Sequence, residues 1–378
     1  MFSGALLNPR LPAEVREKLK QLCELFPLPE HTWIASSGSS APGVDSVKLI
    51  ALSHRALQAS AQAVNRHLQA TNQDVWFQSL PEFHVGGLGV RIRAELSGSH
   101  RFLFDSEKWN PQTFAQQAEQ RGATLGALVP TQIFDLVMAK VKAPPSFRAI
   151  VVGGANLGED LYLNARALGW PLLPSFGMTE CCSQIATASL AGLDRGDRSL
   201  EILSHIQART TSEGFLEISS PSLLTGYAQW VSGVPRWFSP TQEGWYRTED
   251  KVEIQGSKLK FSGRDSDFIK ISGEGVSLLG LQTILEEALG SMNIQSLKNF
   301  AICPIPDSRV GFQIYLAVAG EMPNSAIDDI IKKFNQHVLP YERIFGFKKI
   351  PLIPRSALGK VIKAQLLEMM KDADIRSL

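Results

Sequence analysis

The sequence is poor in cysteine, carries almost no net charge and has no long apolar run. Its four cysteines lack CxxC spacing and are too few for a disulfide-bonded scaffold, so we expect reduced thiols in a cytoplasmic protein. A formal net charge of +1 gives no electrostatic reason to expect nucleic acid or an anionic membrane as a partner. No stretch approaches the roughly 18 apolar residues of a membrane span, and residues 1–10 lack a signal-peptide pattern. We therefore expect neither a membrane anchor nor a secretory leader.

Strand and helix patterns alternate through the first half of the chain. Helical spacing runs over 12–26, and Ser53 is a suitable N-cap for a helix that extends to Leu68. Buried-strand patterns cover 75–80, 124–129 and 148–155. Helical patterns follow the last two of these at 132–141 and 159–168. This order predicts an α/β fold with a mainly parallel sheet that is covered on both faces.

The second half has a different pattern. Antiparallel strands are predicted at 214–220, 251–254 and 259–262, and we interpret them as a small β-barrel-like part attached to the sheet. A separate α+β unit is predicted from helices at 278–289 and 326–338 and strands at 300–303, 312–318 and 344–350. We therefore expect a large N-terminal domain over 1–264 and a smaller C-terminal domain over 265–378, with a hinge near Asp265 and Ser266.

The stretch Ser175–Glu180 brings an aromatic ring, a glycine, a hydroxyl and a carboxylate together after the apolar run 171–174. Phe176 offers a stacking face, and Gly177 permits close backbone approach. Thr179 can donate to a phosphate oxygen, while Glu180 can hold a hard cation such as Mg2+. The stretch therefore suits a nucleotide site, although an ordinary turn after a buried strand would produce the same pattern.

Two other stretches suit ligands. Residues 36–43 form a loop of small residues whose amides and hydroxyls could cradle phosphates, with a flexible linker as the alternative. His84 lies beside Gly86 and Gly87 at the exit of a predicted strand, where α/β sheets contact ligands. A lone histidine is nevertheless more often structural.

Seven segments, in this order, resemble motifs of the adenylate-forming family of acyl-CoA synthetases, luciferases and peptide-synthetase adenylation domains. They are Ser36–Ser40, Phe83–Gly87, Gly153–Ala155, Ser175–Glu180, Trp245–Asp250, the hinge motif Gly263–Lys270 and Pro354–Lys360. The resemblance spans nearly the whole chain from Ser36 to Lys363. It implies the family's fold, in which the C-terminal domain moves as a lid between two reaction steps.

The resemblance implies that ATP activates a carboxylic acid as an acyl-AMP, from which the acyl group passes to coenzyme A. It assigns catalysis to Lys360, Thr179, Glu180 and His84, with Mg2+ on Glu180 and His84 at the acyl pocket. The implied ligand contacts are Ser36, Ser37, Gly38, Ser39, Ser40 and Lys48 at the phosphates, Gly153, Gly154, Ala155, Ser175, Phe176 and Gly177 around adenine, Asp250 and Arg264 at the ribose, and Gly273 at the thioester step. Cys181 and Cys182 have no role in this scheme, and we interpret them as packing residues.

Within the family, Leu80–Gly87, Leu128–Gln132 and Ser272–Val276 most resemble the o-succinylbenzoate–CoA ligases. A ligase for another aryl or medium-sized acid stays open, as does a non-catalytic member that binds nucleotide.

Two features depart from the family. Ala41 stands where the phosphate loop usually has glycine, and Lys48 aligns with that loop's lysine only through a short insertion. The loop also comes about a hundred residues earlier than in the family, much of a subdomain by usual sizes. We therefore expect the N-terminal side to be covered by residues 1–33, by a second copy in a homodimer or by another protein.

Overall fold

The computed structural model describes residues 2–37, 47–155, 157–264, 268–271, 274–292, 294, 297–307, 310–356, 359–371 and 376–377. Contacts divide them into two compact units. Unit 1 comprises the described residues up to Thr248 together with Val252–Phe261. Unit 2 comprises Glu249–Lys251 and the described residues from Ser262 onward.

A parallel sheet forms the centre of unit 1. Its strands are β4 (Val75–Gln78), β5 (His100–Leu103), β6 (Leu125–Leu128), β7 (Ala149–Val152) and β8 (Leu172–Met178). They lie in the order β5-β4-β6-β7-β8, and each adjacent pair is parallel. The predicted α/β class is confirmed, because helices separate these strands in the sequence.

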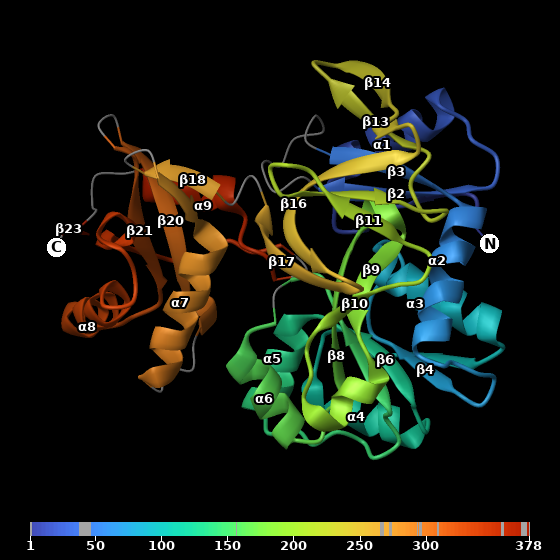
Figure 1. Ribbon diagram of the computed structural model, residues 1–378, viewed down its shortest axis with the longest axis horizontal. Helices are drawn as coiled ribbons and strands as arrows, with labels where there is room; N and C mark the ends of the chain where they lie inside the picture. Colours follow the sequence, from blue (N-terminus) through green and yellow to red (C-terminus); the bar gives the residue numbers. More distant parts are fainter. Residues whose placement is uncertain are drawn as a thin grey trace. The chain divides into compact units, whose positions relative to one another are not determined.

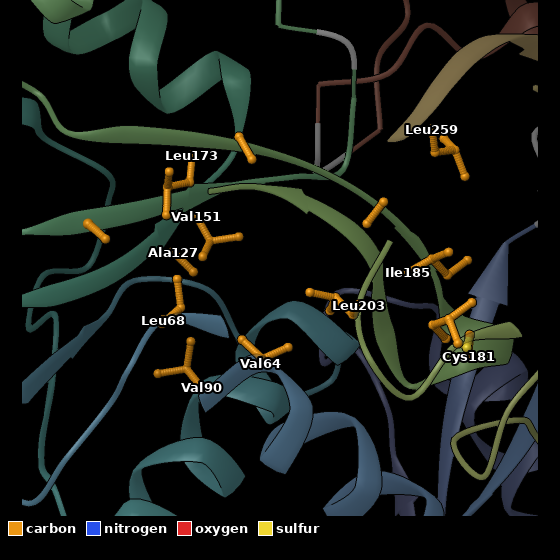
Figure 2. Close-up of a cluster of buried hydrophobic side chains, with 14 of the residues drawn as sticks. Val64, Leu68, Val90, Ala127, Val151, Leu173, Cys181, Ile185, Leu203 and Leu259 are labelled. Atoms are coloured by element: carbon orange, nitrogen blue, oxygen red, sulfur yellow. The ribbon is translucent and has the colours of Figure 1, made fainter. Parts of the chain in front are cut away.

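Helices cover both faces of this sheet, as Figure 1 shows. On one face lie α2 (His54–His67) and α3 (Val85–Ser97), and on the other lie α4 (Pro111–Gln120), α5 (Pro130–Met138) and α6 (Glu159–Ala167). Successive side chains of a strand point to opposite faces, so Val151 packs with α2 and α3 while its neighbour Val152 packs on the other side. Figure 2 shows Val151 with Val64, Val90 and other members of the first cluster. Ser53 caps α2 as predicted, since its Oγ accepts from the Ala56 amide at 3.1 Å.

Antiparallel strands continue the same sheet beyond β8. They are β9 (Ser183–Ala188), β10 (Leu200–Ile202), β11 (Gln207–Thr210), β12 (Phe215–Ser219), β15 (Thr241–Gln242), β16 (Trp245–Gln255) and β17 (Lys258–Arg264). In the described part of the chain, the sheet reaches twelve strands. The segment Trp245–Asp250 therefore lies within the long strand β16.

A second sheet of unit 1 has five strands among the described residues, in the order β1-β2-β3-β13-β14. These are β1 (Gly4–Leu6), β2 (His31–Ser37), β3 (Val47–Ser53), β13 (Gly226–Val231) and β14 (Val234–Phe238). Helix α1 (Ala13–Leu25) covers one face, where Leu19 and Leu22 are fully buried against Trp33 and Leu49. Alternate residues of the strands, such as Ile34 and Ile50, pack toward α2 and α3 on the other face.

In the described part of unit 2, a four-stranded sheet lies between helices. Its strands are β20 (Phe300–Asp307), β21 (Gly311–Ala319), β22 (Ile344–Ile350) and β23 (Arg376–Ser377), beside the hairpin β18 (Phe268–Ile271) and β19 (Glu274–Ser277). Helices α7 (Leu278–Ser291) and α8 (Asn324–Asn335) pack on one face and α9 (Lys363–Met370) on the other. The α+β pattern predicted for this region is thus present. Among the described residues of either unit, no helix is long and apolar enough to cross a membrane.

Candidate active site

The carboxyl ends of the parallel strands share one edge of the unit 1 sheet. Because β4, β6, β7 and β8 run in the same direction, the residues that follow them emerge together. His84 follows β4, Gly153–Ala155 follow β7, and Thr179 and Glu180 follow β8. Three of the predicted site segments therefore meet at the edge where α/β sheets bind ligands.

Strand β8 changes partners within Ser175–Glu180. Up to Pro174 it pairs in parallel with β7, and from Ser175 it pairs antiparallel with β9. The Ser175 Oγ donates to the Val152 carbonyl at 3.0 Å, which ties the two strands together at the switch. We predicted a loop over Ser175–Glu180, but β8 continues to Met178 because β9 supplies new partners. Only Thr179–Cys181 form a turn, which is a single 3-10 turn.

Glycines allow close packing around the switch in β8, and at Gly177 the close neighbours are backbone atoms. A Cβ on Gly177 would lie 1.8 Å from the Ser183 carbonyl oxygen, next to an irregularity in the β8–β9 pairing. A Cβ on Gly153 would lie 3.0 Å from the Ser175 Oγ, and Gly154 has a φ of +90°. These residues therefore fix the distance between β7, β8 and β9 around the predicted adenine site.

The turn after β8 holds strained backbone. Glu180 accepts the Leu224 amide on its carbonyl oxygen at 2.8 Å. Directly after the turn, Cys182 has a φ of 55° and Ser183 a φ of 139°, conformations that cost about 1–3 kcal/mol each for residues other than glycine. Such strain is maintained only where the surrounding structure enforces it, and it often accompanies functional sites. The Thr179–Glu180 turn is therefore held in a defined shape.

Phe176 is partly buried and lies against Phe261 of β17, with ring centroids 5.4 Å apart and planes 29° apart. The opposite face of the Phe176 ring is the one that could stack on adenine.

The donor set near Glu180 fits Mg2+ bound with substrate phosphates. In the regions that the structure describes, no group of three or more His, Cys, Asp or Glu side chains could hold a metal by itself. Mg2+ usually takes one or two carboxylates together with phosphate oxygens and water. A single carboxylate at the end of β8 is enough for that kind of site.

The phosphate loop is described only at its two ends. Gly38, Ser39, Ser40 and Ala41 lie outside the described residues. Ser36 and Ser37, predicted in a loop, belong to β2 because the backbone of each pairs with β3. That register places Ser36 opposite Lys48, whose ammonium lies 4.9 Å from the centroid of the Tyr227 ring.

His84 is the N-cap residue of α3. Its ring lies 4.7 Å from that of Phe83, and its Nε2 is buried without a hydrogen-bond partner among the described residues. Burial lowers the pKa of His84, so the imidazole is neutral at pH 7. The neighbouring Gly87 lies in the first turn of α3, where a Cβ would be 2.3 Å from the Leu80 and Pro81 carbonyl oxygens. Gly87 therefore allows α3 to pack closely on the segment that follows β4. His84, which was predicted at the exit of a strand, thus lies at the beginning of a helix.

Arg93 is a buried cation that the sequence analysis missed. It lies on α3 with 1% of its surface exposed, and its guanidinium faces β9. One terminal nitrogen donates to the Ser183 Oγ at 3.3 Å. With the Gln184 amide oxygen turned toward it, that oxygen accepts from both terminal nitrogens at 3.1 and 3.3 Å. Burial lowers the pKa of Arg93 to about 10, so it stays charged at neutral pH.

Both cysteines of the turn region are packing residues in the structure. Cys181 and Cys182 are fully buried, and the Cys181 Sγ lies 3.1 Å from the Ser222 Oγ. Burial raises the pKa of Cys181 to about 12 and that of Cys182 well above its usual value. Neither thiol forms a nucleophilic thiolate at neutral pH.

The remaining predicted residues belong to unit 2. The Arg264 Nε donates to the Asp250 carboxylate at 2.7 Å, and the Asp250 side chain is only 3% exposed. Lys360 follows Gly359 and is exposed. Gly273 and the hinge position Ser266 lie outside the described residues.

Comparison with known proteins finds a family match for part of the chain. Residues 46–205 match the model of the AMP-binding enzymes, a segment that is less than half of the chain. The matched segment contains His84, Arg93 and the Thr179–Glu180 turn. The predicted resemblance to this family is confirmed over that segment.

Curated relatives and solved structures are similar to this chain over more residues than the matched segment 46–205. The 2-succinylbenzoate–CoA ligase of Escherichia coli is 30% identical over 332 residues, which are 82% of this chain and 65% of that protein. The ligase of the same name from Enterococcus faecalis is 24% identical over 83% of this chain and 65% of its own length. The chain thus spans just under two thirds of these relatives.

Structural similarity extends over nearly the whole chain. The o-succinylbenzoate CoA synthetase (MenE) of Bacillus subtilis, in complex with the acyl-adenylate intermediate OSB-AMP, superimposes with a TM-score of 0.76. It is 22% identical, and the match covers 92% of this chain and 70% of that one. ATP-bound MatB from Rhodopseudomonas palustris has a TM-score of 0.74 and 20% identity, over 90% of this chain and 68% of that one. These similarities show that the chain shares the fold of these two proteins.

Proposed function

We propose that this protein is an AMP-forming acid–CoA ligase that acts on 2-succinylbenzoate with ATP, Mg2+ and coenzyme A, in the cytoplasm. The carboxylate would attack the α-phosphate of ATP and release pyrophosphate, and the acyl group would then pass to the CoA thiol. The observation that carries the proposal is the match to the AMP-binding enzymes over a segment in which the Thr179–Glu180 turn ends the switch strand β8 and is followed by the strained residues Cys182 and Ser183. The names of the relatives support the choice of acid.

The chain's own residues supply positioning and charge for such a reaction. Thr179 donates to phosphate oxygens, and Glu180 holds Mg2+, which when bound neutralises phosphate charge. Phe176 stacks on adenine with its free face. Asp250 accepts from the ribose hydroxyls while Arg264 keeps the carboxylate oriented. Lys360 brings an ammonium to the carboxylate and α-phosphate oxygens, where two anions must meet.

Arg93 favours an acid with two carboxylates. Its charge is compensated in the described structure by neutral oxygens of Ser183 and Gln184. A buried cation of this kind stabilises an anion nearby, even through intervening side chains, because the local dielectric constant is low. 2-Succinylbenzoate carries one carboxylate that reacts and a second that stays charged. We propose that the positive charge of Arg93 attracts this second carboxylate and so stabilises the bound acid.

Isotope exchange of pyrophosphate into ATP tests the function. We expect exchange that depends on 2-succinylbenzoate and that Lys360→Ala abolishes without loss of ATP binding. Lys349→Ala, an exposed lysine of β22, is the matched control and should keep full exchange. Folded wild-type protein that binds ATP but shows no acid-dependent exchange would instead be a non-catalytic nucleotide-binding member. Exchange with a different aryl acid alone would reassign the substrate.

A further inference from the structure

Arg355 ties the two sides of the Lys360 turn together. Its backbone forms a bridge with Val361, on the far side of the turn. Its guanidinium donates to the Gly359 carbonyl at 3.0 Å, directly before Lys360, and to the Lys298 carbonyl at 3.2 Å. Lys298 belongs to a 3-10 turn (Leu297–Asn299) that leads into β20. One side chain thus fastens the turn to the sheet of unit 2.

The backbone around Lys360 is also fixed by Ser356. The Ser356 amide donates to the Lys360 carbonyl at 2.7 Å, and the Lys360 amide donates to the Ser356 Oγ at 3.2 Å. Gly359 closes the turn with a φ of +79° and donates its amide to the Ser356 carbonyl at 2.8 Å. The start of the Lys360 side chain is therefore defined by hydrogen bonds on both sides.

Glu286 of α7 lies near enough to Arg355 to act on it electrostatically, and both groups are partly buried. The Gln282 amide nitrogen donates to the Glu286 carboxylate at 3.2 Å. The Gln282 side-chain oxygen accepts the Ile302 amide of β20 at 2.9 Å. Polar contacts therefore link the sheet to Glu286 on α7.

We propose that Arg355 is a positioning residue for Lys360 in the adenylation step. This inference rests on the proposed function. Arginine suits the task because its planar guanidinium donates to two carbonyls at once, which a lysine ammonium at this position would do less well. Because Arg355 donates to the Gly359 carbonyl directly before Lys360, its effect acts through the backbone of Gly359.

The two half-reactions separate this role from a purely structural one. We expect Arg355→Gln to lower pyrophosphate exchange about 100-fold, as a displacement near 1 Å would. Transfer from preformed acyl-adenylate to CoA should stay close to the wild-type rate. Arg355→Lys and Glu286→Gln should lose less exchange than Arg355→Gln. The control Arg343→Gln changes an exposed arginine of the same unit and should leave both half-reactions unchanged.

Hydrogen exchange gives a readout that needs no activity. In Arg355→Gln the Gly359 and Lys360 amides should exchange faster, with little change in α8. Exchange activity within threefold of wild type in the folded variant, or amide protection that stays unchanged, would overturn the inference. An equal loss in both half-reactions would also overturn it. Wild-type protein without acid-dependent pyrophosphate exchange would refute the proposed function instead. In that case the hydrogen exchange of the Gly359 and Lys360 amides would still test whether Arg355 fixes the turn.

Discussion

Replacing Gly177 by alanine tests whether the contact between β8 and β9 shapes the nucleotide site. The added Cβ would lie 1.8 Å from the Ser183 carbonyl oxygen, 2.6 Å from its carbon and 2.9 Å from the Gln184 Cα. All three are backbone atoms, so no side chain can rotate away. The strand pair must separate by more than 1 Å to restore ordinary contact distances, and the Thr179–Glu180 turn would move with β8.

The magnitude follows from two opposing effects. Overpacking of a tightly packed site costs about 1–3 kcal/mol, while a Gly→Ala change recovers about 0.4–1 kcal/mol through the unfolded chain. Taken at their midpoints, the two effects give a net loss of about 1.3 kcal/mol, which corresponds to a decrease of about 3–5 °C in the melting temperature of a unit of this size. A shift near 1 Å in the turn should lower pyrophosphate exchange about 100-fold.

Calorimetry and the exchange assay on the same preparation measure both effects. Gly280→Ala in α7 is the control, because its Cβ would meet only ordinary contacts at 3.5 Å on Ser277. That control should keep its exchange rate, and its melting temperature should not fall, because the alanine gains about 0.4–1 kcal/mol through the unfolded chain. A Gly177→Ala protein that melts within about 1 °C of wild type and exchanges normally would refute the proposed packing of β8 on β9.

Two further predictions concern titratable groups. Burial raises the pKa of Cys23, Cys181 and Cys303 to about 12 and that of Cys182 well above its usual value, so a disulfide reagent at about pH 8 should modify all four thiols only after denaturation. Rapid modification of a thiol in the native protein would contradict the burial. Burial lowers the pKa of His205 from 6.5 to about 4, so the unfolded chain takes up a proton first and stability is lost as the pH falls from about 6.5 toward 4. The free energy of unfolding, measured with urea near pH 7 and pH 4.5, should be lower at pH 4.5, and His205 should contribute about 2 kcal/mol to the difference. His205→Gln should remove that contribution. An unchanged pH dependence in the variant would assign the difference to other groups.

Periodicity was enough to predict the parallel sheet and the α+β unit. β6 and β7 are short apolar runs bounded by turn residues, and α8 has buried residues on one face only. These elements are specified locally, since each buries side chains that its own spacing already places together. The order of strands and helices then restricted the fold to the α/β class, which the structure confirms.

Helix α3 was missed because its glycines are used for packing. Gly86, Gly87 and Gly89 disfavour a helix by about 1 kcal/mol each, so the sequence resembled a loop. In the structure, a Cβ on Gly87 would collide with the exit of β4, and one on Gly89 would lie 2.9 Å from the Arg93 guanidinium. Tertiary contacts thus override local propensity, and they also bury Arg93, which no sequence pattern marked.

The hairpin β13–β14 was missed for a different reason. Ser232 and Gly233 form the turn between its two strands, but the hairpin's place beside β3 depends on residues far away in the sequence. The site residues follow the same rule. Their order along the chain indicated the chemistry, whereas the pairing of Asp250 with Arg264 became visible only in three dimensions. Their roles in catalysis stay predictions.

The pairing of β3 with β13 has a consequence for biosynthesis. Ala51 pairs with Gly226, about 175 residues later, so β3 leaves the ribosome long before its neighbour exists. Synthesis adds about 5–20 residues per second, so the side of β3 that later pairs with β13 stays without that partner for roughly 10–35 seconds. The apolar run Leu49–Leu52 lies in this strand. An unpaired apolar strand is a template for intermolecular association. We therefore expect nascent chains that end before residue 226 to be held by chaperones, and the yield of native protein to depend on that protection more than on the stability of the finished fold.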